Sequence, residues 1–452
     1  MTEPRVTETR ILADWMLTQS EFGLIADAEL IIGADGRIAY AGPRRAEAAP
    51  GDLVLGAQVL MPGLVNGHTH SAMTLLRGVS DDEGLAPWLD AVRSRELKMT
   101  HADIATGLKL AMVEMLRSGT TAFADMYHWD EQLLGLVRDA GMRVLAAPAL
   151  FTPEAVGFPA ADDRDGRAML EETERLAELF AGDEQIRLAY GPHAPYTCPP
   201  EFLAEIGERA VRTGLPVHIH LSESAPEVEV NRERFGTTPV LHVDALGLLN
   251  ARVLVAHGVH LTQEEIELLA RKGASISHNP VSNLKLGSGI APLPEMLASG
   301  VGLTLGTDSV ASNNSLDLFE ELKTGAIVHR GARQSADAVL GSDLLTMATS
   351  GGAAAIGYPE AGALEAGRFA DVISVDLGGA HATPLHSVTS FLGFAARGSD
   401  VRHVFVGGRH LLNDGELTTL DESAILSDAA AATRRIHSEL EQTEHGDGGG
   451  PG

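Results

Sequence analysis

Short apolar runs alternate with amphipathic helical segments along most of this chain, and this alternation restricts the possible folds more than any other feature. Helical segments such as 131–140 and 201–213 end at a glycine, where a left-handed backbone costs least, and an apolar run follows. Nearly continuous apolar strands between helices are typical of a parallel sheet covered on both faces. Eight such strand–helix units predict an α/β protein with a (β/α)8 TIM barrel. The eight runs lie near 64–70, 121–126, 143–149, 186–193, 216–221, 253–258, 275–280 and 302–308.

A doubly wound parallel sheet is the alternative fold. It rarely needs eight successive strands, and the glycine fingerprint of a dinucleotide-binding sheet is missing. Gly287 and Gly289 are followed by Pro292, where a third glycine would be required. The barrel is therefore the preferred prediction.

The two ends of the chain differ from the middle. Residues 1–60 and 362–420 contain short strand-like runs separated by turn residues. Neither end can bury a core of its own, so we expect them to pair into one small β-domain beside a barrel at 61–361. We also expect a C-terminal helix at 421–442 and a glycine-rich, disordered tail at 443–452.

Composition and charge exclude several classes of protein. The chain of 452 residues is 44% hydrophobic and 21% charged, as ordinary globular proteins are. With 34 basic and 62 acidic residues, it has no broad basic face for nucleic acid. We find neither an apolar run of about 18 residues nor a secretion signal, and expect a cytoplasmic protein with no membrane association. Cys198 is the single cysteine, which excludes internal disulfides and a thiolate-rich zinc site.

Histidines lie at the ends of five of the eight predicted strands, where a parallel barrel carries its reactive groups. Residues two apart on a strand face the same side, so His68 and His70 can share one metal ion, and His218 and His220 have the same spacing. Asp308 ends the last strand. Neutral imidazoles with one carboxylate suit Zn²⁺, with Fe²⁺ as the alternative metal. The alternative interpretation is a row of buried histidines bonded to backbone carbonyls.

Two further groups on the same rim are expected to act on a metal-activated water. Glu223 follows His220 by three residues, and a carboxylate beside such a water is a natural proton shuttle. His257 and Asp308 are placed to hydrogen-bond the same water. We expect Glu227 to be a surface glutamate. None of the five lysines ends strand three or four, where a modified lysine could bridge two ions, so we expect one metal ion.

Five motifs in order along the chain resemble the amidohydrolase superfamily. Within it the chain is similar to the branch of the 5′-methylthioadenosine/S-adenosylhomocysteine deaminases and the triazine hydrolases. The resemblance implies the barrel, a β-sandwich from both termini, a mononuclear site with His68, His70, His220 and Asp308 as ligands, and a homo-oligomer, either a dimer or a tetramer. The motifs are Pro62-Gly-Leu-Val-Asn-Gly-His-Thr-His70, His220-Leu-Ser-Glu223, Ala256-His257, Ser277-His-Asn-Pro-Val-Ser-Asn-Leu-Lys-Leu286 and Leu305-Gly-Thr-Asp308.

The same resemblance implies a reaction. A metal-dependent hydrolase of this kind would convert the 6-amino group of an adenosine-type nucleoside to the inosine-type product and ammonia. Glu223, His257 and Asp308 would be its catalytic residues. The candidate substrates are adenosine, 5′-deoxyadenosine, methylthioadenosine and S-adenosylhomocysteine. Residues that match substrate contacts, or could replace one, are Trp88, Glu96, His193, Glu223, Ser312 and Arg167.

Two other functions remain open. One is an aminohydrolase or chlorohydrolase of a free base or triazine, such as guanine, 8-oxoguanine or hydroxyatrazine. The resemblance implies that Glu96 binds the ribose hydroxyl groups of a nucleoside, and such an enzyme would have no use for that contact. A non-catalytic scaffold of the same fold would have lost its metal ligands, which are all present here. The cytidine-deaminase fold is excluded because His437-Ser-Glu439 has no cysteine pair to complete its zinc site.

Overall fold

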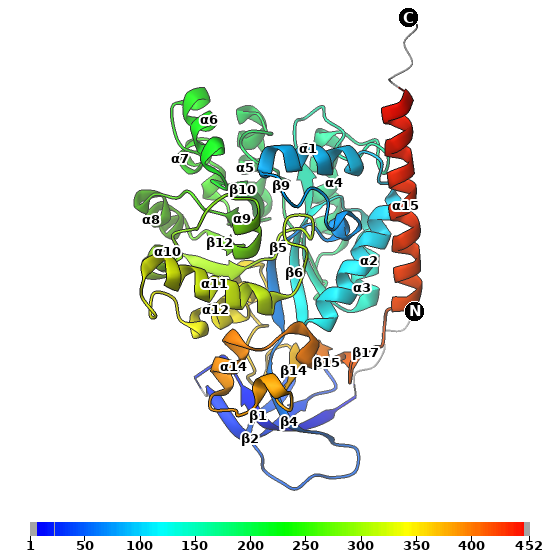
Figure 1. Ribbon diagram of the computed structural model, residues 1–452, viewed down its shortest axis with the longest axis vertical. Helices are drawn as coiled ribbons and strands as arrows, with labels where there is room; N and C mark the ends of the chain where they lie inside the picture. The colour runs from blue at the N-terminus through cyan, green and yellow to red at the C-terminus, as the bar shows by residue number, and fades with distance from the viewer. Residues whose placement is uncertain (1–6, 22, 447–452) are drawn as a thin grey trace, which may run out of the picture.

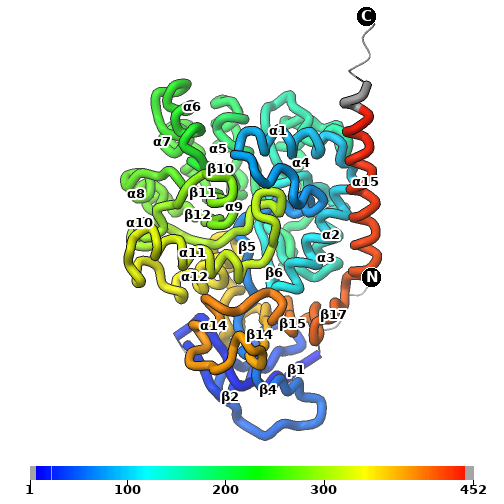
Figure 2. Tube along the Cα trace, viewed as in Figure 1, coloured from blue at the N-terminus to red at the C-terminus, as the bar shows by residue number. Residues whose placement is uncertain are grey.

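The computed structural model describes residues 7–21 and 23–446. Figures 1 and 2 show an α/β part and, below it, a β-sheet part that contains both the first and the last strands of the chain. The long C-terminal helix α15 (Glu422–Gly446) runs along the side of the α/β part, beside α2 (His101–Arg117).

The α/β part contains two parallel sheets, with the strand orders β5-β6-β7-β8 and β10-β11-β12-β13. Each of the eight predicted apolar runs overlaps one of these strands, and the fourth run is divided into β8 and the short β9, which also pairs with β7. The strands are β5 (Leu64–Thr69), β6 (Thr120–Tyr127), β7 (Arg143–Leu150), β8 (Ile186–Leu188), β9 (Gly191–Pro192), β10 (Val217–Leu221), β11 (Val253–His257), β12 (Ser275–His278) and β13 (Gly302–Leu305).

The two parallel sheets contact each other along both edges. On one side, Tyr190 forms an isolated parallel bridge with Val217 of β10. On the other, the amide of Asp308, just after β13, donates to the carbonyl of His68 in β5 at 2.9 Å. The carboxyl ends of strands from both sheets therefore lie close together.

Helices follow most of these strands, and local sequence explains where they begin and end. Thr262 and Glu265 form a reciprocal capping box at the start of α8 (Gln263–Lys272), and Gly273, with a φ of 70°, ends this helix. The remaining helices are α1 (Leu85–Glu96), α3 (Glu131–Ala140), α4 (Gly166–Leu179), α5 (Pro200–Thr213), α6 (Ala225–Phe235), α7 (Pro239–Ala245), α9 (Pro280–Lys285), α10 (Leu293–Ser299), α11 (Leu318–Arg333), α12 (Gly341–Met347), α13 (Ser350–Ala355) and α14 (Val388–Phe394).

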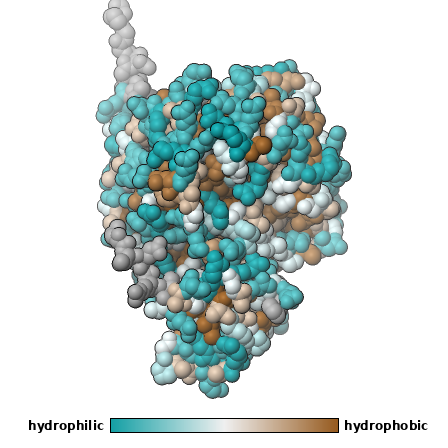
Figure 3. Space-filling model, turned by 180° about the vertical axis from the view of Figure 1, so that it is seen from behind, coloured by the Kyte–Doolittle hydropathy of each residue, from teal (hydrophilic) through white to brown (hydrophobic). Residues whose placement is uncertain are grey.

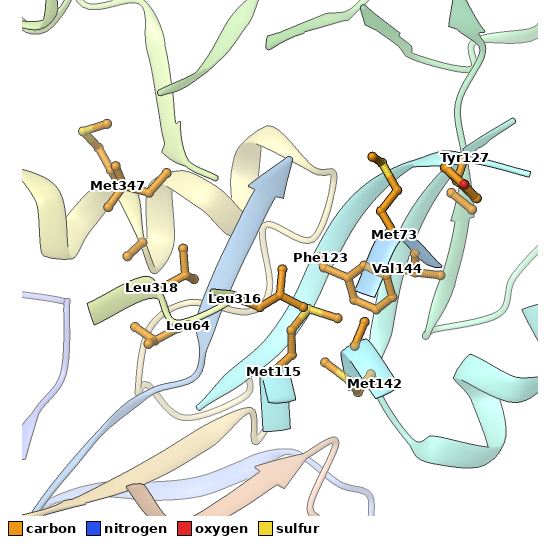
Figure 4. Packing of buried hydrophobic residues seen from close by; sticks show 14 of the residues in the cluster. Leu64, Met73, Met115, Phe123, Tyr127, Met142, Val144, Leu316, Leu318 and Met347 are labelled. Carbon is orange, nitrogen blue, oxygen red and sulfur yellow. The ribbon is translucent and has the colours of Figure 1, made fainter. Parts of the chain in front are cut away.

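A large cluster of buried apolar side chains fills the space between strands and helices. Figure 4 shows part of it, where Phe123 of β6 lies among Met115, Met142 and Val144. In α3, Leu133, Leu134, Val137 and Ala140 are buried at helical spacing against this core. The core thus holds the sheets and their helices in fixed relative positions, which positions the strand ends.

The β-sheet part is one eight-stranded sheet in the order β17-β16-β15-β14-β4-β1-β2-β3. Antiparallel pairing of β4 with β14 joins the two ends of the chain, with Met61 opposite Ile373. Its strands are β1 (Thr9–Leu17), β2 (Leu24–Ile32), β3 (Ile38–Pro43), β4 (Leu53–Pro62), β14 (Val372–Asp376), β15 (Val401–Val406), β16 (Arg409–Asn413) and β17 (Glu416–Leu417).

The C-terminal helix is longer than the sequence predicted. Residues 443–446, which we expected in the tail, belong to α15, and 447–452 lie outside the described residues. Arg435 of α15 pairs with Asp103 of α2, and Arg117 pairs with Glu422. These ion pairs fix the helix along α2.

Hydrophilic side chains cover much of the face seen in Figure 3, in agreement with the acidic composition. Among the described residues, we find no helix whose length and apolar character together would let it cross a lipid bilayer.

One buried ion pair links the α/β part to the terminal sheet and gives a testable prediction. Arg143 Nε of β7 lies 2.7 Å from Asp371 Oδ2, and both side chains are 2% exposed. Removing one partner leaves an uncompensated buried charge, so Arg143→Met should lower the free energy of unfolding by about 3–5 kcal/mol. Chemical denaturation measures this loss.

The matched control is Arg37→Met. Arg37 contacts Glu184 and Glu360 near the same junction, but these glutamates are more than half exposed. Such surface pairs contribute about 0–1 kcal/mol. Equal losses for the two variants would contradict a special role for the buried pair.

Candidate active site

A cavity of about 320 Å³ opens at the carboxyl ends of the parallel strands. Polar side chains gather at one part of its wall, and apolar side chains form much of the rest. The polar lining residues at the strand ends are His70, His193, His220, Glu223, His257 and Asp308.

The four predicted metal ligands lie together at this cavity. His70 Nε2 is 3.3 Å from His220 Nε2 and 3.3 Å from Asp308 Oδ1. His68 Nε2 is 3.5 Å from the same carboxylate oxygen and, although buried, has no hydrogen-bond partner. Four donor atoms therefore face one small space.

Hydrogen bonds on the far side of each ring determine which nitrogen faces this space as an acceptor. His70 Nδ1 donates to the carbonyl of Met126 at 2.6 Å, and His220 Nδ1 donates to the carbonyl of His193 at 2.7 Å. Because a carbonyl only accepts, the neutral ring has its lone pair on Nε2. Two such lone pairs 3.3 Å apart need a proton or a metal ion between them. This donor set fits a divalent metal ion.

Electrostatics favour a positive charge at the same point. Burial lowers the pKa of His68 to about 3 and that of His220 well below its usual value, so both rings are neutral at pH 7. Burial opposes a positive charge on His70 as well. The hydrogen bond to Asp308 and the negative charge of that carboxylate outweigh the effect of burial and raise the pKa of His70 to about 9. Burial alone would raise the pKa of Asp308, but the close approach of the His68 and His70 ring nitrogens, at 3.5 and 3.3 Å from Oδ1, outweighs it and holds this pKa well below its usual value. The carboxylate is therefore charged.

Two hydroxyl groups orient the Asp308 carboxylate. Ser282 Oγ and Ser312 Oγ donate to Asp308 Oδ2 at 2.6 and 2.8 Å, and the amide of Ser309 donates to Oδ1. Asp308 has a φ of 59°, a left-handed conformation that is uncommon among non-glycine residues and that these bonds help to hold. Ser312 was expected at the substrate, but it is buried behind the carboxylate and is not part of the cavity wall. In this position it contacts the Asp308 carboxylate, and its role as a substrate contact stays a prediction.

Glu223 and His257 face each other beside the metal ligands. Glu223 Oε2 is 3.8 Å from His257 Nε2, and His257 Nδ1 is 2.9 Å from Asn283 Oδ1. Burial raises the pKa of Glu223, which favours its uptake of a proton. A buried carboxyl group at a cavity wall, close to the ligand cluster, is suited to proton transfer.

Besides Glu223, three of the predicted substrate contacts line the same cavity: Trp88, Glu96 and His193. Trp88 Nε1 donates to the carbonyl of Ala311 at 3.1 Å, which fixes the indole ring in the wall. Arg167 lies elsewhere. It is on the first turn of α4, its side chain is 52% exposed, and it pairs with Glu205 of α5 at 3.1 Å. This face of α4 points to α5, so the structure does not bring Arg167 to the cavity.

Comparison with known proteins places this chain in a family. Residues 59–411 match the Amidohydrolase family. The chain belongs to the amidohydrolase family. A 5′-deoxyadenosine deaminase of Methanosarcina barkeri is 42% identical over 90% of this chain and 93% of the relative. A 5-methylthioadenosine/S-adenosylhomocysteine deaminase of Moorella thermoacetica is 44% identical over 89% of this chain and 93% of the relative.

Solved structures agree with this family assignment. An adenosine deaminase from Xanthomonas campestris, crystallised with bound zinc, has a TM-score of 0.90 and 33% identity, and the match covers 96% of this chain and all of that one. A triazine hydrolase variant has a TM-score of 0.86, with 94% of this chain and 100% of that chain covered. Because it is 24% identical, it supports the fold alone.

The structure of this amidohydrolase also adds site residues that the sequence analysis missed. Arg93 lines the cavity, with Nη1 3.4 Å from Glu96 Oε2, and its position one helical turn before Glu96 could have indicated this. Glu227, expected at the surface, is buried, and its carboxylate accepts from the amides of Ser222 and Glu223. The capping pattern from Ser224 to Glu227 was the signal for that role.

Proposed function

We propose that this amidohydrolase is a metal-dependent deaminase that converts the 6-amino group of an adenosine-type nucleoside to the inosine-type product and ammonia. One observation carries the proposal: the imidazoles of His68, His70 and His220 and the carboxylate of Asp308 converge at the wall of the cavity that the buried Glu223 also lines. The deaminases of adenosine-type nucleosides among the relatives support the same reaction.

The proposal includes the finer architecture. The edge contacts at Tyr190 and Asp308 support closure of the two parallel sheets into one eight-stranded barrel at 61–361. The pairing of β4 with β14 supports a composite domain of residues 1–60 and 362–420. We propose that its eight-stranded sheet folds over on itself as a sandwich. We also propose a dimer or tetramer, as in the family resemblance.

His68, His70, His220 and Asp308 would hold one divalent ion, for which we propose Zn²⁺, with Fe²⁺ as the alternative. Such an ion, when bound, activates a water molecule by lowering its pKa. The bound zinc in the Xanthomonas campestris enzyme agrees with this choice.

The side chains of this chain then supply the proton transfers. Glu223 takes a proton from the attacking water and gives it to the ring nitrogen beside the amine-bearing carbon. Protonation of that nitrogen lets the carbon accept the hydroxyl group without placing negative charge on the ring. His257 and Asp308 orient the water. The new hydroxyl group then gives its proton to the amine, which leaves as ammonia while the carbon becomes a carbonyl.

Glu96 is the residue that separates a nucleoside substrate from a free base. Its carboxylate can accept from the ribose hydroxyl groups, while Trp88 and His193 contact the rest of the substrate. Met73, Leu85 and Phe151 make the cavity wall apolar, which suits a 5′-deoxy or 5′-methylthio group.

Activity over a panel tests this function. Ammonia release by the zinc-loaded protein should be confined to adenosine, 5′-deoxyadenosine, methylthioadenosine and S-adenosylhomocysteine. Turnover of guanine, 8-oxoguanine or a hydroxytriazine alone would keep the reaction class and contradict the nucleoside assignment. Absence of turnover on the whole panel would contradict the function.

Glu96→Ala gives the sharper prediction. Loss of a hydrogen bond to a charged group costs about 1.5–3 kcal/mol, so kcat/KM for the nucleoside should fall about 10–150-fold. The control is Glu201→Ala, an exposed glutamate on α5. Unchanged kcat/KM in Glu96→Ala would contradict the ribose role and favour a free base or triazine.

A further inference from the structure

A second group of metal-binding side chains lies outside the active-site cluster. His101 begins α2, while His128 and Asp130 follow β6 directly, and their donor atoms lie within 4.8 Å of one another. None of the three lines the active-site cavity. The deaminase function proposed above does not use them.

The buried ring nitrogen of His128 is a feature that hydrogen bonding does not explain. The residue is 4% exposed, and its Nε2 is buried without a hydrogen-bond partner. That nitrogen lies 3.6 Å from Asp162 Oδ2 and 3.9 Å from Asp130 Oδ2. A buried ring nitrogen left unpaired between two carboxylates costs free energy unless something binds there.

The other two side chains complete a donor set. His101 Nε2 is 2.7 Å from Asp130 Oδ2, so this one carboxylate oxygen lies between the two histidines. The other oxygen of Asp130 accepts from the amide of Leu133 and caps α3, which fixes the carboxylate. His101 and Asp130 are 28% and 21% exposed, so an ion can enter from solvent.

We infer that His101, His128 and Asp130 form a second binding site for a divalent transition-metal ion such as Zn²⁺. Bonds of about 2.0–2.1 Å place tetrahedral donors about 3.3 Å apart. The distances from Asp130 Oδ2 to His101 Nε2 (2.7 Å) and to His128 Nε2 (3.9 Å) lie on either side of that value. Asp162 is the nearest candidate for the fourth position, although it also pairs with Arg164. Water would take this position otherwise.

The site would stabilise one wall of the active-site cavity. It joins the start of α2 to the end of β6 and, with Asp162 as the fourth ligand, also to the loop that carries Asp162. Phe158 of that loop lines the cavity, and its ring centroid is 4.5 Å from that of Tyr127 at the end of β6. A bound ion would therefore cross-link the segments behind Tyr127 and Phe158.

Metal content tests the inference. The full-length protein is stripped with a chelator, incubated with excess Zn²⁺, desalted and analysed by mass spectrometry for zinc per chain. We expect two equivalents in the wild type and one in His101→Gln, whose partly exposed position makes it the safer variant. His128→Gln should give the same loss, and His386→Ala, an exposed histidine, should keep both ions.

The active-site variant His220→Ala separates this inference from the proposed function. It should lose one ion and keep the other, and the remaining ion should disappear when His101→Gln is added. If the wild type binds one equivalent of zinc and His101→Gln retains it, the second site is overturned. If the protein binds two ions but turns over no nucleoside of the panel, the proposed function is overturned and the second site is still supported.

Thermal unfolding gives an independent readout. Zn²⁺ in excess should raise the unfolding midpoint of His220→Ala by several degrees, because an ion that binds only the folded state stabilises it. The same addition should leave the double variant His101→Gln/His220→Ala unchanged. An equal shift in both would contradict the site.

Discussion

Replacing Glu223 by glutamine should reduce kcat about 10²–10⁴-fold, the range expected when a positioned proton-transfer group is lost. Glutamine has nearly the same shape but cannot accept a proton from water and pass it to a ring nitrogen. The buried carboxyl group, with its raised pKa, lies 3.8 Å from His257 and close to the ligand cluster. Steady-state ammonia release on the best nucleoside of the panel measures the effect.

The metal content of Glu223→Gln separates proton transfer from metal binding. Because Glu223 is not among the four proposed ligands, the variant should keep its active-site metal. The control is Glu229→Gln, an exposed glutamate on α6. Full activity in Glu223→Gln would contradict its role, and loss of the metal would show that this carboxylate binds the ion.

Removal of one imidazole from the ligand cluster should have the other large effect. His220→Ala takes away the Nε2 that lies 3.3 Å from His70 Nε2, and with it one of the donors for the ion. We expect loss of the active-site zinc and a fall in kcat/KM of about 10³-fold or more, because water without a metal has a pKa near 15.7. Zinc analysis and ammonia release measure the two effects.

Chelation provides the reversible version of this experiment. Dialysis of the wild type against a strong chelator should abolish activity, and added Zn²⁺ should restore it. His386→Ala controls for the loss of a histidine and should behave as the wild type. Retained activity in a protein that contains no metal would contradict the proposed mechanism.

Local patterns predicted the elements of the fold well. The sequence run 302–308 and its seven counterparts each overlap a parallel strand, because buried parallel strands are apolar throughout. The glycines 141 and 214 predicted the ends of two helices, since such a signal lies within one turn of the chain.

The spacing of His68 and His70 likewise carried information about the candidate site. Residues two apart on a strand face the same side, and the two rings do meet the same carboxylate, that of Asp308. The role of His68 and His70 as metal ligands remains a prediction, as do the proton transfer by Glu223 and the ribose contact of Glu96. The zinc experiments and the variants above test these roles.

Side-chain partners across the fold could not be derived in this way. Arg167 faces α5, Ser312 lies behind the Asp308 carboxylate, and Arg93 enters the cavity. Each outcome depends on which face of a helix or loop meets which neighbour, and that is a property of packing between distant segments.

The second histidine cluster illustrates the same limit. His101 and Asp130 are 29 positions apart, and they meet because α2 and β6 pack side by side. The sequence alone determined the strand and helix pattern, the family and the residue types that can bind metal, because these depend on local order along the chain. Only the tertiary structure decided which of those side chains share a cavity, since burial and proximity arise when the sheets and helices pack together.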